Sequence, residues 1–396
     1  MARPNVTVVI NDESFSVPGT ESGSSVRAGM PSYFSLISAV GNTAERNSGE
    51  MTSESVSDWI GRLKSGDPVG AAYSADAFQA GNTFERWGHG PTGAWANEWW
   101  AAHNYLQYGG VLLIGGTGID DPSGGDVKLT NTQNRLDVVF AATGGANNAL
   151  LSTIASTRKD CVAITNGETG SNLIADATYS GSSEDEYNIC VLGRKIHLNI
   201  NRASDSSTYV TTNCAADVAG CIARNDKLAD PWWSPAGFKR GQILDVIRLQ
   251  QNPTESEMDT LYDDEINPVV TFPGEGTVLF GDKTRAADSS SLSRINVSRL
   301  FIFLKRTIGA AARDKLFEFN DSQTRQSFVN AVIPMLNIVK ARRGVYDFKV
   351  VCDESNNTSS VIDSNQFIAD VYIKPSKSIN YIRLTFTNKN TADILE

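Results

Sequence analysis

The stretch that most constrains this chain is a pair of long helices predicted across residues 295–344. In the first, apolar side chains recur every three or four residues, the spacing of one helix face: Val297, Leu300, Phe301, Leu304, Ile308 and Ala311. Ile302 and Phe303 add a second apolar side, so we expect this helix to be covered nearly all round. Its polar side carries Arg299, Lys305, Arg306, Arg313 and Lys315.

A polar break separates the two predicted helices. Asn320, Asp321 and Ser322 stop the first helix and supply an N-cap for the second. We expect Pro334 to kink the second helix, because proline removes a backbone donor and crowds the preceding turn. Gly344 is predicted as the C′ residue that ends it. The apolar face of the second helix consists of Phe328, Val332, Met335, Leu336 and Val339.

The charge is distributed unevenly along the chain. The 396 residues carry a net charge of −10, which argues against direct nucleic-acid binding, and they are enough for two or three domains. Many basic residues nevertheless lie between Arg294 and Arg343. This pattern indicates either a surface for an acidic protein neighbour or a solvated helix face, and the sequence leaves both open.

No targeting or membrane segment is predicted. The start, MARPNVTVVIND, has no apolar core of a signal peptide, and no apolar run approaches the about 18 residues of a membrane span. The five cysteines are an odd number without a CxxC pair, which is typical of reduced core residues in a chain made in the cytoplasm. They are Cys161, Cys190, Cys214, Cys221 and Cys352.

Both ends of the chain have a β pattern. Residues 3–18 alternate, with Val6, Val8 and Ile10 on one side, and the polar stretch 20–25 that follows is a flexible hinge by composition. Residues 379–388 alternate too, with one side formed by Ile382, Leu384 and Phe386. An isolated strand cannot bury its own apolar face, so each end must pair with a sheet, in its own chain or in another.

Between these ends the pattern is mixed α/β. Strands that alternate with helices favour sheets with helices packed on them. Helices are predicted at residues 53–63, 92–108, 149–157 and 215–224, and strands at 111–114, 137–142, 161–165, 187–192, 195–199, 243–249, 346–352 and 367–373. Thr254 and Glu257 have the spacing of a capping box, and residues 266–284 form a predicted hairpin.

No reaction centre emerges from the sequence. A glycine loop with Gly115 and Gly116 follows a predicted strand, as a phosphate cradle requires, but Asp120 and Asp121 would repel a phosphate and no Walker motif occurs. The three histidines, at 89, 103 and 197, lack metal-ligand spacing. We therefore predict no catalytic, cofactor or metal residues, and keep a nucleotide-binding α/β enzyme that uses the Gly115–Gly116 loop as the alternative from another class.

From residue 230 onward, the chain resembles the contractile tail sheath proteins of myovirus-type bacteriophages. Four blocks carry the likeness: DPWWSPAGFKRGQI at 230–243, INPVVTFPGEGTVLFGDKT at 266–284, INVSRLFIFLKRTI at 295–308, and the helix, strand and loop at 328–358. Ser298 stands where the family more usually has arginine. Upstream, only the helix-to-strand passage 100–110 and the strand 158–164 fit.

The resemblance implies two sheet-plus-helix domains with extended β arms. The expected division is an N-terminal linking arm at residues 1–25, a variable α/β region at 26–229, a C-terminal sheath domain at 230–378 and a C-terminal linking arm at 379–396. In such proteins the arms join the sheets of neighbouring subunits. The inter-subunit residues would then be Val6, Val8, Ile10, Ile382, Leu384 and Phe386.

The resemblance also implies a non-enzymatic machine. Hexameric rings stack helically around the tail tube in a metastable extended state, and contraction drives the tube through the bacterial envelope for DNA ejection. The expected partners are further copies of the chain, the tube protein, and the baseplate and terminator proteins, with no membrane partner, in a virion assembled in the host cytoplasm. The tube-facing candidates are Arg299, Lys305, Arg306 and Arg313. A tailocin or another phage-derived injection device is the alternative within this class.

Overall fold

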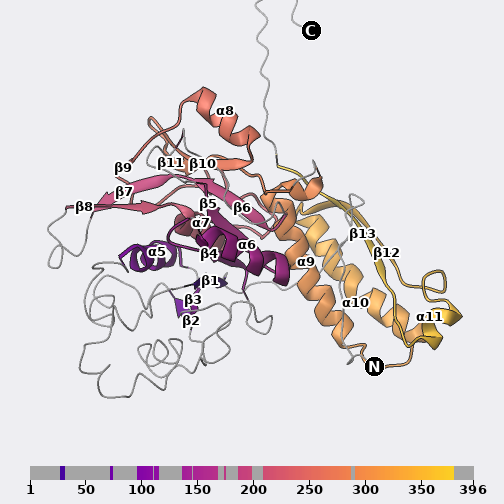
Figure 1. Ribbon diagram of the computed structural model, residues 1–396. Coiled ribbons are helices and arrows are strands. Elements are labelled where there is room, and N and C mark those ends of the chain that lie inside the picture. The colour runs from indigo at the N-terminus through magenta and orange to yellow at the C-terminus, as the bar shows by residue number, and fades with distance from the viewer. Residues whose placement is uncertain are drawn as a thin grey trace, which may run out of the picture.

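The computed structural model describes residues 27–31, 72–74, 96–109, 111–115, 136–144, 146–167, 174, 186–198, 208–286 and 290–378. It confirms the mixed helix-and-sheet fold: a large sheet with helices against it, and a long helix pair to one side (Figure 1). Both predicted arms and the predicted helix at 53–63 lie outside the described residues.

The large sheet has eight described strands in the order β11-β10-β6-β5-β4-β1-β3-β2. The six inner strands run parallel, and the outermost strands at each end are antiparallel. Every residue of β4 and β5 is buried, which is why these segments are continuous apolar runs rather than alternating ones. The strands are β1 Arg27–Pro31, β2 Ala72–Ser74, β3 Val111–Gly115, β4 Val138–Phe140, β5 Val162–Asn166, β6 Asn188–Leu192, β10 Ile266–Phe272 and β11 Gly276–Leu279.

Helices pack against the central strands of this sheet. Helix α6 (Ala146–Arg158) packs on β4 and β5, while α5 (Ala96–Leu106) packs against α7 (Ala215–Leu228), which itself contacts β4, β5 and β6. Helix α7 is rich in small residues, and a Cβ at its Gly220 would lie 2.2 Å from the Tyr108 ring. Glycine there lets the ring lie directly on the helix backbone.

A smaller sheet corrects one prediction. It consists of β7 (Arg194–Leu198), β8 (Tyr209–Asn213) and β9 (Arg248–Leu249), so the strand predicted at 243–249 is wrong except for its last two residues. Ile243 instead donates its N–H to the Thr277 carbonyl at 2.9 Å, and Asp245 has a φ of 50°. A left-handed residue ends an extended ladder, so the segment turns from the hairpin to β7.

The hairpin and the capping box are confirmed. Strands β10 and β11 pair around a turn in which Gly274 and Gly276 have positive φ, and helix α8 (Glu255–Asp263) begins with Thr254 and Glu257 bonded reciprocally. Because β10 also pairs with β6, the large sheet continues past residue 230. The boundary that we predicted between residues 229 and 230 therefore does not coincide with a break in the sheet.

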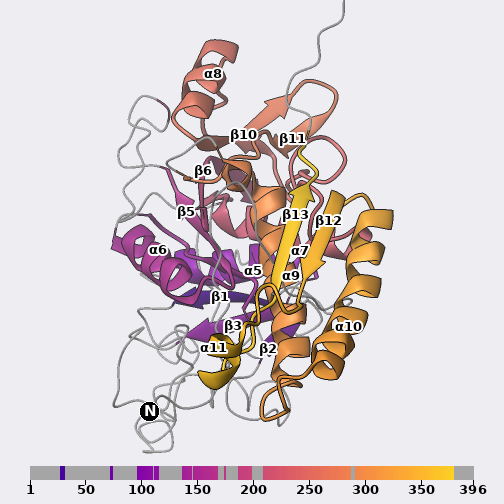
Figure 2. The ribbon, with the colours of Figure 1, turned by 90° about the vertical axis from the view of Figure 1, so that its right-hand side faces the viewer.

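The predicted helix pair is also confirmed. Helix α9 (Ile295–Arg313) follows a short 3-10 turn (Ser291–Ser293), and α10 (Ser322–Ala341) begins where the Asp321 carboxylate accepts the Thr324 N–H at 2.7 Å. Pro334 lies within α10, which runs on to Ala341. The two-stranded sheet of β12 (Val345–Val351) and β13 (Asp370–Pro375) lies against the pair, with α11 (Ser359–Asp363) between its strands in sequence (Figure 2).

These elements enclose a second apolar core beside that of the large sheet. It combines one stripe from each long helix with the inner face of the two-stranded sheet and Trp232. The residues are Trp232, Leu300, Leu304, Ile308, Phe328, Val332, Leu336, Val339, Val345, Cys352, Val371 and Ile373. Helix α9 lies between the two cores, because Ile295 and Ile302 belong to the core of the large sheet.

The end of α10 differs from the prediction. Arg343, not Gly344, takes the left-handed C′ position, with a φ of 67°. The Gly344 N–H bonds the Val339 carbonyl at 2.8 Å and the Arg343 N–H bonds that of Lys340 at 3.0 Å, which is a Schellman motif. Gly344 is required for space instead, since a Cβ there would lie 2.7 Å from the Val339 side chain and 3.1 Å from the Trp232 ring.

Two further predictions concern the described residues. All five cysteines are free and buried, as expected of reduced core residues. No helix in the described part of the chain is long and apolar enough to cross a membrane.

Candidate subunit interface

The first tube-facing candidate, Arg299, is not on a solvated helix face. Its residue is 5% exposed, and its guanidinium donates to both carboxylate oxygens of Asp226, at 2.7 and 2.8 Å. Burial acts to lower the pKa of Arg299, but the Asp226 carboxylate outweighs it and the pKa is raised. The pattern that put Arg299 on a polar side was wrong about its exposure, because the paired carboxylate comes from α7, far away in sequence.

Arg306 and Lys305 also bind the large-sheet domain. The Arg306 guanidinium contacts the Asp137 carboxylate and the Leu136 carbonyl at the start of β4. The Lys305 ammonium donates to the Lys159 carbonyl, just after α6, at 2.9 Å. Together with Arg299, these side chains hold α9 against the domain that carries the large sheet.

Arg313 is the candidate with an exposed position. It lies in the last turn of α9, and its guanidinium donates to the Gly309 carbonyl in the same helix at 3.2 Å. Contact between these residues and a tube stays a prediction. Of the four candidates, Arg313 could contact a tube without losing a hydrogen bond to another element of the fold.

The two-stranded sheet offers open edges. Strands β12 and β13 pair antiparallel with each other, and within the described residues each has one edge without a strand neighbour. The sheet buries one face on α9 and α10, and its outer face exposes Tyr346, Lys349, Tyr372 and Lys374. Unpaired N–H and C=O groups along such edges are a template for strands from another chain.

A large pocket lies where the end of α10, the start of β12 and the hairpin meet. We call it the C-terminal pocket because Ser376, Lys377 and Ser378 line it, and its volume is about 910 Å³. Its aromatic lining consists of Trp232, Trp233, Tyr262, Phe280 and Tyr346. Two guanidinium groups, those of Arg240 and Arg343, lie over the Trp233 ring at 5.1 and 5.5 Å from its centroid.

The last described residues are fixed at this pocket. The Ser376 carbonyl accepts the Asn296 side-chain amide at 3.1 Å, and the Ser378 hydroxyl donates to the Asp282 carboxylate at 2.5 Å. Burial raises the pKa of Asp282 to about 6. The segment predicted to form the C-terminal arm therefore begins from an anchored point. The six candidate arm residues, Val6, Val8, Ile10, Ile382, Leu384 and Phe386, lie outside the described part of the chain.

The comparisons with known proteins decide the family. The phage tail sheath protein central domain matches residues 137–285, and the phage tail sheath C-terminal domain matches residues 287–389. Together these matches cover more than half of the chain. The chain belongs to the phage tail sheath family.

Individual sheath proteins agree with this. A tail sheath protein of Vibrio phage KVP40 is 51% identical over 183 residues, which are 46% of this chain and 27% of that protein. The tail sheath protein of Enterobacteria phage T4 is 44% identical over 220 residues, 54% of this chain and 33% of that protein. The chain thus spans about a third of the length of the curated sheath proteins that it matches.

The fold matches sheaths of injection systems along its whole length. The sheath of an extracellular contractile injection system, PVC, in its contracted state superposes with a TM-score of 0.68 at 14% identity, covering 98% of both chains. The contracted helical sheath of the anti-feeding prophage gives 0.67 at 15% identity, covering 98% of this chain and all of the other. The sheath fold is therefore shared without close sequence identity.

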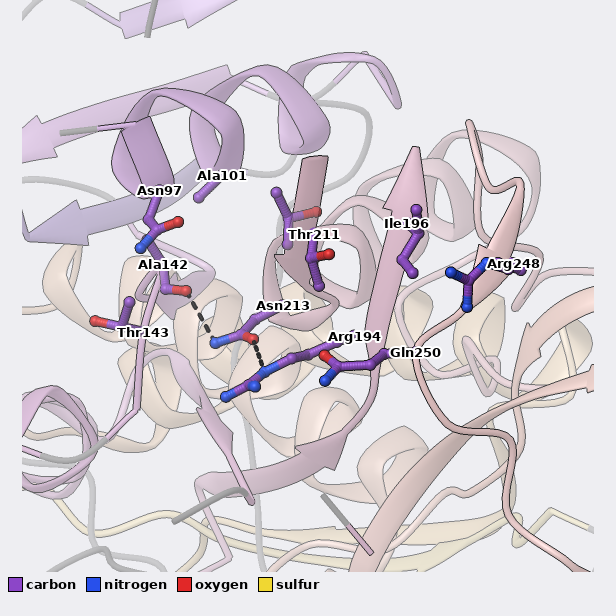
Figure 3. A pocket seen from close by; sticks show the side chains of 11 residues that line it. Asn97, Ala101, Ala142, Thr143, Arg194, Ile196, Thr211, Asn213, Arg248 and Gln250 are labelled. Atoms are coloured by element: carbon purple, nitrogen blue, oxygen red, sulfur yellow. Dashed lines mark hydrogen bonds between the residues drawn. The ribbon is translucent and has the colours of Figure 1, made fainter. Parts of the chain in front are cut away.

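A second pocket is polar, and nothing in it resembles a catalytic centre. It lies between α5, the loop after β4 and the smaller sheet, with a volume of about 490 Å³ (Figure 3). The Asn213 amide bonds the Ala142 carbonyl and the Arg194 guanidinium, each at 3.1 Å. Its described lining has two arginines, Arg194 and Arg248, but no carboxylate, histidine or cysteine to act as a general base or nucleophile.

The histidines and the glycine loop were the other candidates for chemistry in the sequence, and the two described histidines are packed in the interior. His103 and His197 are buried beside Trp100, and burial lowers the pKa of His103 to about 4. No group of three or more potential metal ligands occurs within the described residues. Gly115 ends β3, whereas Gly116, Asp120, Asp121 and His89 lie outside the described ranges.

The sequence analysis did not predict one buried ion pair, which lies in the domain that carries the large sheet. The ammonium of Lys195 donates to the Asp217 carboxylate at 2.9 Å, and both side chains are fully buried. The Tyr108 hydroxyl donates to the same carboxylate at 3.0 Å and accepts the Leu244 N–H at 2.8 Å. A lysine within a predicted strand was the available signal. The network joins the turn after α5, strand β7, helix α7 and the loop before β9, and its role is structural.

Proposed function

We propose that this chain is the sheath subunit of a contractile tail. Copies stack as hexameric rings around a tube in an extended, metastable state, and their rearrangement shortens the sheath and drives the tube through a bacterial envelope. The observation that supports this most directly is the two-stranded β12–β13 sheet with open edges, in a chain of the tail sheath family. The tube, baseplate and terminator proteins are the partners of this proposal, and the virion is its location.

The open edges supply a linkage mechanism. Strands β12 and β13 have seven and six residues, enough to pair with the short alternating segments around Val6–Ile10 and Ile382–Phe386. Backbone hydrogen bonds between an arm and the edge of β12 or β13 would give affinity, and alternate side chains of the arm would give specificity. If residues 20–25 form the hinge that we predict from their composition, subunits could pivot while the ladder persists.

The energy for contraction would come from packing rather than from a bound nucleotide. At about 25 cal/mol per Å², an additional ~200 Å² of apolar burial per subunit is worth about 5 kcal/mol. Summed over a long sheath, such a difference between two lattices is a large mechanical store. The subunit itself would then need no catalytic activity.

Truncation tests the linkage. We expect full-length protein to form tubes by negative-stain electron microscopy, whereas deletion of residues 1–18, or of everything after Ser378, leaves folded monomers. An internal control is the double substitution Val6→Leu and Val8→Leu, which keeps the apolar alternation and should keep the tubes. Normal tubes from either truncation would refute the arm mechanism.

The tube contact has a separate test. Arg313→Glu should weaken attachment to the tube protein while leaving sheath polymerisation intact, since its hydrogen bond stays within α9. Charge reversal at Arg299 or Arg306 cannot serve, because it would break the contacts with Asp226 or Asp137 first. Unchanged cosedimentation of the Arg313 variant with tubes at physiological salt would exclude this position from the interface.

The shared fold supports a second candidate in the same class. The chain superposes on sheaths of contractile injection systems with TM-scores of 0.68 and 0.67. We therefore also propose a phage-derived injection device as its setting. Purified particles from the source cells discriminate the two: tails joined to DNA-filled heads indicate a phage, and headless tails indicate the device.

A further inference from the structure

The turn between the two long helices exposes two aromatic rings. Phe317 is 87% exposed and Phe319 is 85% exposed, the largest values among the exposed large apolar residues of the described chain. We call residues 314–321, DKLFEFND, the aromatic tip. Single exposed apolar residues are ordinary on protein surfaces, but two nearly bare phenyl rings in one short turn indicate a contact site.

The aromatic tip holds its rings outward through its backbone. Phe317 has a φ of 72°, a conformation that is uncommon for a bulky side chain. Successive backbone bonds fix the turn, from the Leu316 N–H to Arg313 and from the Glu318 N–H to Lys315. An ordered turn that presents rings in this way loses little conformational freedom on binding.

The same molecule carries a site with matching chemistry. The C-terminal pocket is lined by aromatic rings and by four cations, Arg240, Lys340, Arg343 and Lys377, against the two carboxylates of Asp259 and Asp282. The aromatic tip has the opposite balance, with Asp314, Glu318 and Asp321 against Lys315. Aromatic and charge complementarity between the two is therefore built into one chain.

The two features lie at opposite ends of one helix. The aromatic tip precedes Ser322, where α10 begins, and the C-terminal pocket receives Lys340 and Arg343 from its end. Twenty residues of α-helix extend about 30 Å, and Figure 2 shows the turn at the far end of the helix pair from the β10–β11 hairpin. The tip thus cannot reach the pocket of its own chain, and a contact between tip and pocket has to join two copies.

We propose that the aromatic tip of one copy inserts into the C-terminal pocket of a second copy. Phe317 and Phe319 enter among the rings of Trp233, Phe280 and Tyr346, and the carboxylates of the tip face the pocket cations. When each copy gives its tip to one neighbour and receives the tip of another, the contact is head-to-tail, and such contacts close into rings or continue as helical filaments. The placement of the contact within a ring rests on the proposed sheath function, whereas the contact itself does not.

Disulfide cross-linking between two variants, each with one added surface cysteine, tests the contact in the full chain. All five native cysteines are buried, so Phe319→Cys and Tyr346→Cys each add one accessible thiol. Mild oxidation of an equal mixture should give a disulfide-linked dimer on a non-reducing gel, and neither variant alone should give it. The matched control replaces Phe319→Cys by Leu228→Cys, a 70% exposed position at the end of α7, and should give at least tenfold less dimer.

The outcomes separate this contact from the sheath function. No dimer, or as much dimer with the Leu228→Cys control, overturns the proposal. A dimer that forms only after tube protein is added also overturns it, because the tip would then serve another partner. If tubes form but the dimer does not, the proposed sheath function stands and this contact is refuted. If the dimer forms but tubes do not, this contact stands and the proposed sheath function is refuted.

A charge exchange provides a second readout that does not depend on cysteine chemistry. Glu318→Lys and Arg343→Glu should each weaken self-association about tenfold by sedimentation, and their combination in one chain should restore most of it. Circular dichroism checks that each variant is folded. If the double variant associates no better than the single ones, the tip and the pocket do not face each other and the proposal fails.

Discussion

Helices α9 and α10 lie side by side on one apolar core, yet the rest of the chain encloses α9 and leaves one face of α10 exposed. Every residue of α9 from Ile295 to Ile302 is buried. Helix α10 buries five residues at helical spacing, namely Arg325, Phe328, Val332, Leu336 and Val339. Helix α9 therefore joins the two cores of the subunit, whereas α10 presents a surface.

Charge confirms this division of roles. On α9, Arg299 and Arg306 are paired with carboxylates of the large-sheet domain. On the outside of α10, six exposed residues at helical spacing are uncharged: Gln323, Gln326, Asn330, Ile333, Asn337 and Ile338. Depletion of charge on an exposed face is typical of the centre of a protein interface.

The largest expected effect is the loss of the buried ion pair on α9. Arg299→Ala leaves the Asp226 carboxylate without its guanidinium in a buried site, and should lower the free energy of unfolding by about 3–5 kcal/mol. The matched change on α10, Lys340→Ala, breaks an exposed pair with Asp347 and should cost less than about 1 kcal/mol. Urea denaturation measures both free energies of unfolding, and equal losses would show that the buried pair on α9 stabilises the subunit no more than the exposed pair on α10.

A pH dependence is expected next to the start of α9. The backbone carbonyl of Asp282 accepts the Ile295 N–H, and burial raises the pKa of its carboxyl from 3.8 to about 6. The folded state therefore holds this proton more tightly than the unfolded chain. Its contribution to stability is complete below about pH 4 and is lost as the pH rises through about 6, by about 1.4 kcal/mol for each pH unit between the two pKa values.

Asp282→Asn isolates that contribution. Relative to the native chain, the variant should gain stability as the pH rises from 4 to 7, because the amide does not ionise. Thermal melts of both proteins across this range measure the difference, in which other titrating groups cancel. A constant difference would mean that Asp282 titrates alike in the folded and unfolded states.

Two glycines near these helices differ in the space around them. Gly344→Ala, just after α10, places a Cβ against Val339 and Trp232 and should cost about 1–3 kcal/mol. Gly309→Ala, within α9, meets nothing within 4 Å and should stabilise by about 0.5–1 kcal/mol through helix propensity. The same substitution is thus expected to have opposite signs, which chemical denaturation resolves.

A small effect is expected at the N-terminus of α10. Asp321→Ala removes the carboxylate that accepts the Thr324 N–H and should cost about 1 kcal/mol. Gln323→Ala, an exposed change in the same turn, should alter stability by less than about 0.5 kcal/mol. A loss at Asp321 no larger than that at Gln323 would show that the cap contributes nothing to folding.

Local patterns in the sequence determined the elements of this sheath chain. The spacing of Phe328, Val332 and Leu336 determined a helix and its buried face, because side chains three or four residues apart share one side. Asp321 and Thr254 determined helix starts, because a cap needs only its own first turn. Motifs from residue 230 onward carried the family resemblance that the comparisons confirm.

Only the tertiary structure decided which charged side chains are buried and where a glycine is required for space. The sequence could not show that Arg299 is buried, since Asp226 lies 73 positions away, and only the packing of α9 on α7 brings them together. The sequence pattern predicts Gly344 as the residue that ends a helix. The structure shows that a larger residue would collide with the Trp232 ring, and only the folded chain brings that ring next to Gly344. Periodicity records which side of a helix is apolar; which distant carboxylate, ring or pocket it meets depends on long-range packing that no local pattern contains.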